Sequence, residues 1–476
     1  MLFNTLAFWF FFAVVLGVYL LLGRRRPQNV FLLLASYFFY GCWDWRFLAL
    51  LLTSTTADWT LGNLIAREPT RAGAKRWVAA SVCINLAFLG FFKYFDFFVD
   101  SAEAALGALG MPGPDWRLRI VLPVGISFYT FQSISYIVDV YRGDLEPAGD
   151  PVDFALFVAY FPHMVAGPIM PSRDLLPQMQ HPRRPRWSDA MTGFHLALWG
   201  LFKKVVVADN LALIANPVFA RQLGFGAGAI HLGALAFAFQ IYCDFSGYSD
   251  IARGVARIMG FRLMENFDHP YLATCVTDFW RRWHISLSRW LRDYLYVPLG
   301  GNREGEARTY RNLALTMVLG GLWHGAAWKF VLWGAYQGAW LVLERALGGK
   351  QLVTDWWRAR GAMGRLLWLA RVLVTFHFVC LGWLIFRAES TGPLWLMVRS
   401  FMDVTGWLRM PAGPALTTAL AIAPVLAVDL AQYFSRDELV LLRIPAPVRA
   451  AVYVAGAYVF ILAGRFESNA FIYFQF

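Results

Sequence analysis

The sequence has 476 residues, of which 58% are hydrophobic and 17% aromatic, whereas only 16% are charged. Soluble domains of this length do not have such a composition, and apolar runs of about 20 residues, enough to cross a bilayer as helices, recur from end to end. The net charge of +12 would suit a nucleic-acid partner in a soluble protein, but here it indicates arginine-rich cytoplasmic loops. The composition therefore excludes a soluble or nucleic-acid-binding domain and predicts a polytopic protein embedded in a lipid bilayer.

The apolar runs are continuous and do not alternate, which favours helices over a closed barrel as the spanning structure. We predict an all-α membrane protein of about 11 to 13 segments, some of them interrupted, that forms one domain over residues 1–476. The first segment, Leu2–Leu22, has no preceding basic region or small-residue cleavage pattern and is predicted to be a retained helix. The five cysteines are Cys42, Cys83, Cys243, Cys275 and Cys380. Because they show no paired spacing, they are predicted to be small core residues, and we expect no metal site.

The apolar pattern of the first 170 residues has two breaks. Residues 30–65 must leave and re-enter the membrane between two basic loops, and the run GCWDW at 41–45 supplies a break for that hairpin. Residues 154–170 are short and interrupted by Pro162 and Pro168, so they are predicted to be a re-entrant segment instead of a full span. His163 in this segment is either a cavity-facing polar group or a structural residue.

Two carboxylates lie inside an apolar run in the middle of the chain. Residues 190–208 are predicted to form a helix that ends in Lys203 and Lys204, and the next run, 231–252, carries Asp244 and Asp250. A carboxylate at membrane depth is costly and usually faces the protein interior or a water-filled path, so both are site candidates. The equally weighted alternative is that they cap or hydrogen-bond kinked helices near Gly247.

Two histidines stand in apolar, tryptophan-rich surroundings. A helix over Phe279–Tyr296, at about 100° per residue, places His284 within an apolar stripe. The stripe comprises Trp280, Trp283, Leu287, Trp290, Leu291, Tyr294 and Leu295. His324 lies in the sequence GGLWHGAAW, where the glycines allow close approach of another backbone or a ligand. Both imidazoles are therefore predicted to face packed surroundings.

The stretch from Arg253 to Arg311 is rich in arginine and contains no lysine. Arginine forks suit phosphate oxygens, so a phosphorylated donor at the cytoplasmic face is one interpretation, and an interfacial amphipathic segment is the other. After His324 the predicted membrane segments are a run to residue 347 and the stretches 366–386, 394–408, 414–431 and 449–463.

Several long motifs together resemble the membrane-bound O-acyltransferase family. They are PVGISFYTFQSISYIVDVYR (123–142), FPHMVAGPI (161–169), QIYCDFSGYSDIARGVARIMGF (240–261), NFDHPYLATCVTDFWRRWHISLSRWLRDYLYVPLGGNR (266–303), NLALTMVLGGLWHGAAWKFVLWG (312–334) and FIYFQF (471–476). The resemblance runs essentially from end to end, with a motif core at about residues 120–345. One departure is Cys243, where we expect an aromatic residue in the family's motif.

The resemblance implies a ring of tilted helices around a thin central region, with a catalytic histidine at His324 and a supporting one at His284. It implies that acetyl-CoA, a cytoplasmic donor and not a bound cofactor, supplies an acetyl group for an extracytoplasmic polysaccharide such as alginate. The implied partners are periplasmic or membrane-anchored esterase-like acetyltransferases, and the implied location is the bacterial inner membrane. Further candidates for substrate or donor binding are Arg281, Arg282, Arg292, Trp283, Trp323, Asp244 and Asp250.

Acyl transfer from a thioester to a hydroxyl needs a base and a group that stabilises the oxyanion, and the neutral imidazole of His324 suits the role of base. A covalent intermediate on Ser246 or Cys243 is disfavoured, because the chain has no GxSxG nucleophile elbow. Two other interpretations stay open. One is transfer of D-alanine from a carrier protein, as in the teichoic-acid branch of the family. The other is a transporter or flippase, against which the lack of inverted repeats argues.

Overall fold

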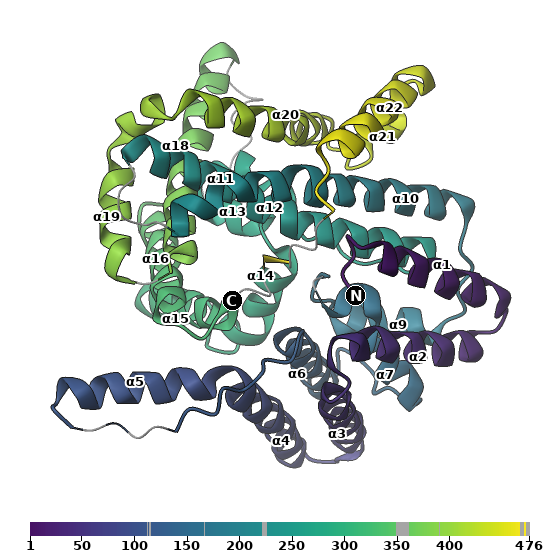
Figure 1. The fold of residues 1–476 in the computed structure, drawn as a ribbon. Helices are drawn as coiled ribbons and strands as arrows, with labels where there is room; N and C mark the ends of the chain where they lie inside the picture. Colours follow the sequence, from purple (N-terminus) through teal and green to yellow (C-terminus); the bar gives the residue numbers. More distant parts are fainter. Residues whose placement is uncertain are drawn as a thin grey trace. The chain divides into compact units, whose positions relative to one another are not determined.

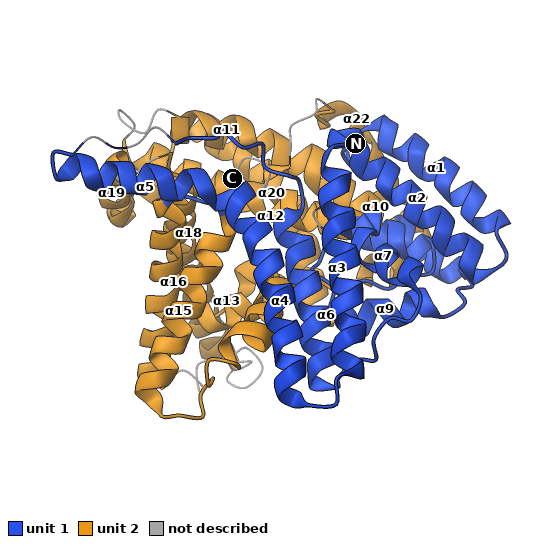
Figure 2. Cartoon of the chain, turned by 90° about the horizontal axis from the view of Figure 1, so that it is seen from below, with its two compact units in different colours: residues 1–194, 252–264, 325–327 blue, residues 195–251, 265–324, 328–476 orange. Residues whose placement is uncertain are grey.

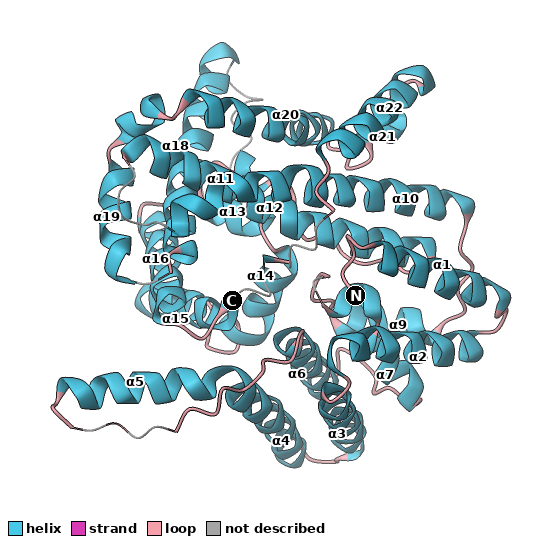
Figure 3. Cartoon of the chain, viewed as in Figure 1, coloured by secondary structure: helices cyan, strands magenta, loops and turns pink. Residues whose placement is uncertain are grey.

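The structure is a computed structural model (Figure 1) that describes residues 1–476 except 112, 114–115, 166, 221–225, 349–360, 390, 467–470 and 473–476. Among the residues that it describes, the regular elements are helices and none is a strand (Figure 3). The predicted all-α class is therefore confirmed. The last four residues of the FIYFQF motif lie outside the described part of the chain.

The chain divides into two compact units, which Figure 2 colours separately. Unit 1 comprises residues 1–194, 252–264 and 325–327, and unit 2 comprises residues 195–251, 265–324 and 328–476. The single domain over residues 1–476 stays a prediction. Both histidines of the predicted site belong to unit 2.

Unit 1 is built mainly from the N-terminal helices. They are α1 Leu6–Leu21, α2 Arg25–Asp44, α3 Phe47–Arg67, α4 Arg71–Leu89, η1 Gly90–Tyr94, α5 Phe95–Ala108, α6 Ile126–Arg142, α7 Pro151–Ala159, α8 Phe161–Met164 and α9 Ser172–Gln180. The break predicted at residues 41–45 is confirmed, because α2 ends and α3 begins there. The interruption predicted within residues 154–170 separates α7 from α8, and the re-entrant path of this segment stays a prediction.

Unit 2 contains most of the remaining elements. They are α10 Trp187–Leu201, η2 Phe202–Ala208, α11 Asp209–Ala220, α12 Ala227–Ile258, η3 Pro270–Leu272, α13 Val276–Arg282, α14 Ile285–Leu291, η4 Arg292–Tyr296, α15 Glu306–His324, α16 Trp328–Ala346, α18 Gly361–Arg387, α19 Thr391–Met402, η6 Val404–Arg409, α20 Ala412–Ser435, α21 Val440–Arg443 and α22 Ala446–Ala463. The first residues of α10 and the last of α12 belong to unit 1.

Within the described residues, five helical stretches are long and apolar enough to cross a membrane. They are Arg71–Ala108, Ala227–Ile258, Gly361–Arg387, Ala412–Ser435 and Ala446–Ala463. The protein is thus a polytopic membrane protein, as predicted, while the number of 11 to 13 segments stays a prediction.

Three local predictions are wrong. The helix predicted to end at Lys203 and Lys204 instead continues through the π-helical turn η2 into α11, because carboxylates bind both ammonium groups. Cys42 and Cys83 are exposed, whereas the other three cysteines are buried as predicted. An apolar run does not distinguish a side chain that faces lipid from one in the core.

The third wrong prediction is the continuous helix over Phe279–Tyr296. The chain leaves helical geometry at Trp283, and His284 adopts the left-handed conformation with φ 44° and ψ 54° before α14 begins. The cause is a partner from another segment, since Asn266 accepts hydrogen bonds from the first N–H groups of α14. A helical period reveals no such partner.

Helices α15 and α16 pack with their backbones in contact, and this packing sets the position of His324 at the end of α15. A Cβ atom on Gly321 would lie 2.9 Å from the Cα of Gly334 and would overlap the carbonyl oxygen of Phe330. Only glycine permits such an approach. Gly321, one of the glycines that the sequence placed near His324, therefore allows these two helices to pack closely.

Candidate active site

Two buried imidazoles face each other in unit 2. The ring centroids of His284, which precedes α14, and His324, which ends α15, lie 6.4 Å apart. His284 is 0% exposed and His324 is 5% exposed. Trp323 borders both, with its ring centroid 6.0 Å from that of His284 and 5.0 Å from that of His324. The structure thus brings together three residues that the sequence proposed separately, and we call this place the histidine pocket.

Aromatic rings form the walls of the histidine pocket. The edge of Phe245 from α12 contacts His284 at a centroid distance of 4.7 Å. His324 contacts Trp333 from α16 at 5.1 Å and Phe386 from α18 at 5.6 Å, both edge-on. Helices distant in sequence therefore enclose the imidazoles in apolar surroundings. Such surroundings keep bulk water away and strengthen any electrostatic interaction with a bound substrate.

Trp283 belongs to a neighbouring group of packed rings, which we call the aromatic layer. Its members are Tyr242, Phe245, Phe267 and Trp283. The ring centroid of Phe267 lies 5.0 Å from those of Phe245 and Trp283 and 6.0 Å from that of Tyr242. Trp283 is 1% exposed, so it packs within protein instead of lining an open site. Because Phe245 contacts His284, this layer forms one boundary of the histidine pocket.

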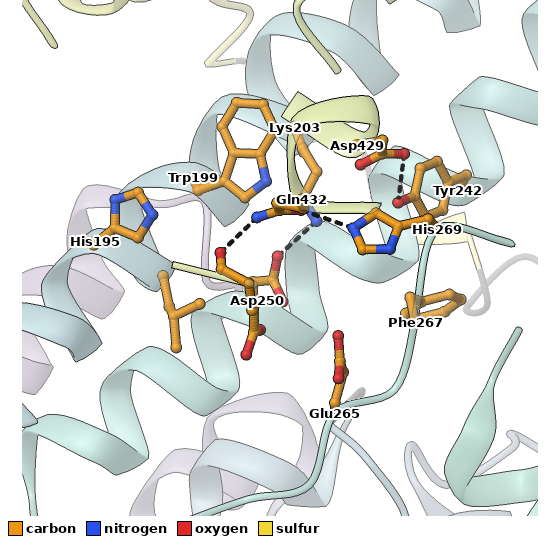
Figure 4. Close-up of a pocket in the computed structure, with 12 residues that line it drawn as sticks. His195, Trp199, Lys203, Tyr242, Asp250, Glu265, Phe267, His269, Asp429 and Gln432 are labelled. Atoms are coloured by element: carbon orange, nitrogen blue, oxygen red, sulfur yellow. Dashed lines mark hydrogen bonds and ion pairs between the residues drawn. The ribbon is translucent and has the colours of Figure 1, made fainter. Parts of the chain in front are cut away.

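Tyr242 and Phe267 of the aromatic layer also line a polar cleft (Figure 4). Its narrow inner part is lined by His195, Leu196, Trp199, Lys203, Tyr242, Asp250, Glu265, Phe267, His269, Asp429, Gln432 and Glu438. A wider outer part of about 360 Å³ shares four of these residues and adds Asp268, Arg282, Tyr433, Arg436 and Asp437. All the lining residues belong to unit 2. The cleft is polar and charged, in contrast to the histidine pocket.

The two intramembrane carboxylates bind lysines of η2. Lys203 Nζ lies 2.6 Å from Asp250 Oδ2 (Figure 4). It also donates to Ser246 Oγ at 2.9 Å. Lys204 Nζ lies 2.7 Å from Asp244 Oδ1 and also pairs with Asp209 at 2.8 Å. Neither interpretation of these carboxylates included a lysine partner. The two adjacent lysines in an apolar helix could have indicated one, because a buried ammonium group also needs an opposite charge. Asp250 lines the cleft, whereas Asp244 does not.

Close contact between α10 and α12 makes these ion pairs possible. A Cβ atom on Gly247 would lie 2.7 Å from the carbonyl oxygen of Gly200. The backbones therefore touch, and η2, which follows α10, is brought beside the acidic turns of α12. Gly247 thus lies where α10 and α12 touch, and the carboxylates before and after it in the sequence, Asp244 and Asp250, each pair with a lysine.

His269 holds the entrance of the cleft through both ring nitrogens. Nδ1 lies 2.8 Å from Asp268 Oδ1, and Nε2 lies 3.0 Å from Gln432 Oε1. Burial alone would lower the pKa of this imidazole, but the hydrogen bond to Asp268 and the nearby Asp429 carboxylate outweigh burial, so the pKa lies above its ordinary value of 6.5. The sequence did not reveal His269 and Gln432 as site residues, because their contact joins segments far apart in the chain.

The three candidate arginines do not converge. Arg282 lines the outer cleft, where its Nε donates to Asp278 at 2.9 Å and its guanidinium lies over the ring of Tyr433 at 5.4 Å. Arg281 is exposed. Arg292 is exposed as well and pairs with Asp293 at 2.7 Å. Only Arg282 therefore shares a cavity with another predicted site residue, Asp250, across the two parts of the cleft.

Comparison with known proteins identifies the family to which the chain belongs. Residues 148–381 match the sequence profile of MBOAT, the membrane-bound O-acyltransferase family. The chain is 45% identical over 426 residues to the "probable alginate O-acetylase AlgI" of Pseudomonas aeruginosa. The aligned region covers 89% of this chain and 79% of that protein. The chain belongs to the membrane-bound O-acyltransferase family. It is a multi-pass membrane protein and an O-acyltransferase.

Two further relatives have other names. The peptidoglycan O-acetyltransferase of Helicobacter pylori is 34% identical over 443 residues, which cover 85% of this chain and 80% of that protein. The teichoic acid D-alanyltransferase of Bacillus subtilis is 28% identical over 278 residues, which cover 56% of this chain and 69% of that protein. Both similarities are weaker than the one to the alginate O-acetylase.

Proposed function

We propose that this protein transfers acetyl groups from cytoplasmic acetyl-CoA across the bacterial inner membrane for the O-acetylation of an extracytoplasmic polysaccharide such as alginate. The observation that carries the proposal is the histidine pocket, in which two buried imidazoles from separate helices lie 6.4 Å apart. The 45% identity to a probable alginate O-acetylase supports acetyl as the acyl group and alginate as an example of the acceptor.

In this mechanism His324 is the general base. Its neutral imidazole takes the proton of the attacking hydroxyl as the hydroxyl oxygen bonds to the thioester carbonyl carbon. The carbon–sulfur bond then breaks, and the imidazolium returns the proton to the departing thiolate. An ester and a free thiol result, so the protons balance. His284 orients a substrate or stabilises the developing oxyanion, and Trp323 packs beside both rings.

We propose that the donor enters from the side on which the polar cleft opens. Arg436 lines this opening, and Arg443 pairs with Asp437 at its edge at 2.6 Å. Basic residues at helix ends favour the cytoplasmic side. Arg282, which lines the same cleft, is proposed to meet donor phosphates, with Arg281 and Arg292 reinforcing the positive charge nearby. Acetyl-CoA acts as a substrate and not as a resident cofactor.

We further propose that the acetyl group passes to a serine of a periplasmic or membrane-anchored esterase-like acetyltransferase, which then modifies the polysaccharide. The family resemblance of the motifs around His284 and His324 supports this relay. A relay also suits the geometry, because a polymer need not enter a pocket walled by Phe245, Trp333 and Phe386.

The test is acetyl transfer by purified protein in liposomes, with labelled acetyl-CoA inside or outside and the candidate partner present. We compare the native chain with His324→Ala, His284→Ala and the control His231→Ala. His231 is equally buried in unit 2 and stacks on Phe401 at 4.5 Å, outside the histidine pocket. Loss of turnover in His324→Ala alone or in both pocket variants, with His231→Ala active, supports the proposal.

Other results would change the assignment. Equal turnover in all four proteins would make His324 structural and overturn the mechanism. No consumption of acetyl-CoA by the native protein, together with transfer from a carrier-bound D-alanyl thioester, would instead place the chain with the D-alanyltransferases. Movement of acetyl-CoA across the bilayer without chemistry would indicate transport.

A further inference from the structure

We propose that Asn266 is the positioning residue of His284, fixing the backbone turn that directs this imidazole into the histidine pocket. The functional weight of the inference rests on the proposed role of His284, while the positioning itself is a separate, measurable property. Four structural observations support the positioning role of Asn266.

The first is the backbone of His284 itself. With φ 44° and ψ 54°, this residue occupies the left-handed region that side-chain-bearing residues rarely adopt. Such a conformation persists only where the surrounding structure imposes it, and it is found preferentially at functional sites. Neighbouring groups must therefore hold the turn between α13 and α14.

The second is the set of hydrogen bonds that Asn266 accepts just after His284. Its backbone oxygen accepts from Ile285 N at 2.9 Å. Its side-chain Oδ1 accepts from both Ser286 N at 3.1 Å and Ser286 Oγ at 2.8 Å. The first N–H groups of a helix have no partner within it, so Asn266 caps α14 from outside the helix.

The third is a matching bond on the other side of the turn. The backbone N–H of Asp268 donates to the carbonyl oxygen of Arg282 at 2.9 Å. The segment 266–268 therefore binds the chain both before Trp283 and after His284. Bonds on both sides leave the turn little freedom to rotate, so the direction of the His284 side chain is determined.

The fourth is the way Asn266 is itself held. It is 1% exposed, and its Nδ2 donates to Ser249 Oγ of α12 at 3.3 Å. Its chain neighbours Glu265 and Phe267 line the polar cleft instead (Figure 4). One segment thus lines the cleft with alternate side chains and caps α14 with Asn266. Sequence periodicity had assigned no role to this asparagine.

The experiment compares Asn266→Ala, Asn266→Asp and the native full-length protein. Aspartate keeps the oxygen that accepts from Ser286, so it is the conservative variant. Asn312→Ala is the matched control, because Asn312 is 0% exposed and its amide binds the carbonyl oxygens of Leu299 and Gly301, not the turn at His284. Diethyl pyrocarbonate is the probe, and mass spectrometry follows its reaction at each histidine.

In Asn266→Ala we expect His284 to react about tenfold faster than in the native protein, the size of effect that follows from loss of a helix cap. His231 and His163 should react at native rates. Asn266→Asp should stay within about twofold of native at His284, and Asn312→Ala should leave His284 unchanged. Equal acceleration at every histidine, an unchanged rate at His284, or aspartate as reactive as alanine would each overturn the proposal.

If Asn266→Ala does not fold, Ser286→Ala takes its place, since it removes one of the two donors to Oδ1 without touching Asn266. Faster labelling of His284 in this variant supports the proposal, and no change overturns it. Acetyl transfer is measured on the same samples, where we expect kcat to fall while KM for the donor stays constant. Faster labelling of His284 with an unchanged kcat would support Asn266 as the positioning residue and overturn only the proposed role of His284 in catalysis.

Discussion

The histidine pocket and the polar cleft both border the aromatic layer, but the side chains that form them differ in kind. The histidine pocket encloses His284 and His324 in rings such as Phe245 and Trp333. The polar cleft encloses charges that bind one another, such as Lys203 and Asp250. Apolar walls suit a reactive imidazole, whereas paired charges suit a structural role at membrane depth.

The difference between the two regions shows that a carboxylate and a histidine inside an apolar run need not have the same role. Carboxylates inside an apolar run and histidines inside an apolar run both look costly, and the sequence treated both as site candidates. In the structure, Asp244 and Asp250 are satisfied by lysines, which is a structural solution to their burial. The variants below test whether the histidine pocket governs the rate of acyl transfer and whether the Lys203–Asp250 ion pair governs stability.

The largest effect is expected from His324→Ala. Loss of a general base lowers acyl transfer by about 10²- to 10⁴-fold, while the unfolding midpoint of the protein should change little. Initial rates in liposomes and thermal unfolding in detergent measure the two quantities. A variant that loses activity only in proportion to its loss of folded protein would erase the proposed distinction between the two regions.

Next in size is Lys203→Met, which leaves the Asp250 carboxylate, whose side chain is 14% exposed, without its lysine. Breaking a buried ion pair in this way costs about 3–5 kcal/mol of unfolding free energy, whereas the double variant Lys203→Met/Asp250→Asn should recover much of that loss. Lys75→Met, at an exposed position, is the control. If the single and double variants are equally stable, the ion pair contributes nothing and the structural reading of the cleft fails.

A smaller effect is expected from Gly321→Ala at the contact between α15 and α16. The added methyl group overlaps the backbone of α16 and costs about 1–3 kcal/mol. Because His324 ends α15, the rate of acetyl transfer should fall as well. Gly456→Ala on α22 is the matched control, since its Cβ would meet nothing within 4 Å. Equal unfolding midpoints for the two variants would contradict the close helix contact.

The smallest effect is the pH dependence contributed by His269. Its pKa is raised in the folded protein, so the folded state binds the proton more tightly than the unfolded state does. The resulting stability is fully present below the ordinary pKa of 6.5 and is lost as pH rises through the raised value. We expect the difference in unfolding free energy between native protein and His269→Gln to shrink over this window by about 1 kcal/mol. A difference that does not vary with pH would show that folding does not raise the pKa of His269.

Much of the fold follows from the sequence because lipid imposes simple constraints. Apolar runs of sufficient length become helices, so α12, α18, α20 and α22 lie close to the predicted segments. The break between α2 and α3 was visible in the run GCWDW at 41–45. The burial of His284 and His324 was also predictable, since each lies among tryptophans and glycines.

What the sequence could not reveal are partners from distant segments. Nothing local distinguishes Asn266 from any other loop asparagine, yet it ends the helix predicted across His284. Gln432 meets His269 across 163 residues of chain. The sequence also gives no sign of where the candidate arginines lie, because Arg282 pairs with Asp278 and Arg292 with Asp293.

The contact between α15 and α16 also bears on the order in which the protein folds. The hairpin joins residues that are near one another in sequence, so bringing them together costs little loop entropy and can occur early. His324 and Trp333 would then meet soon after both helices are in the membrane. Phe386 follows Trp333 by a much longer stretch of chain, so bringing it against His324 costs more loop entropy than forming the hairpin.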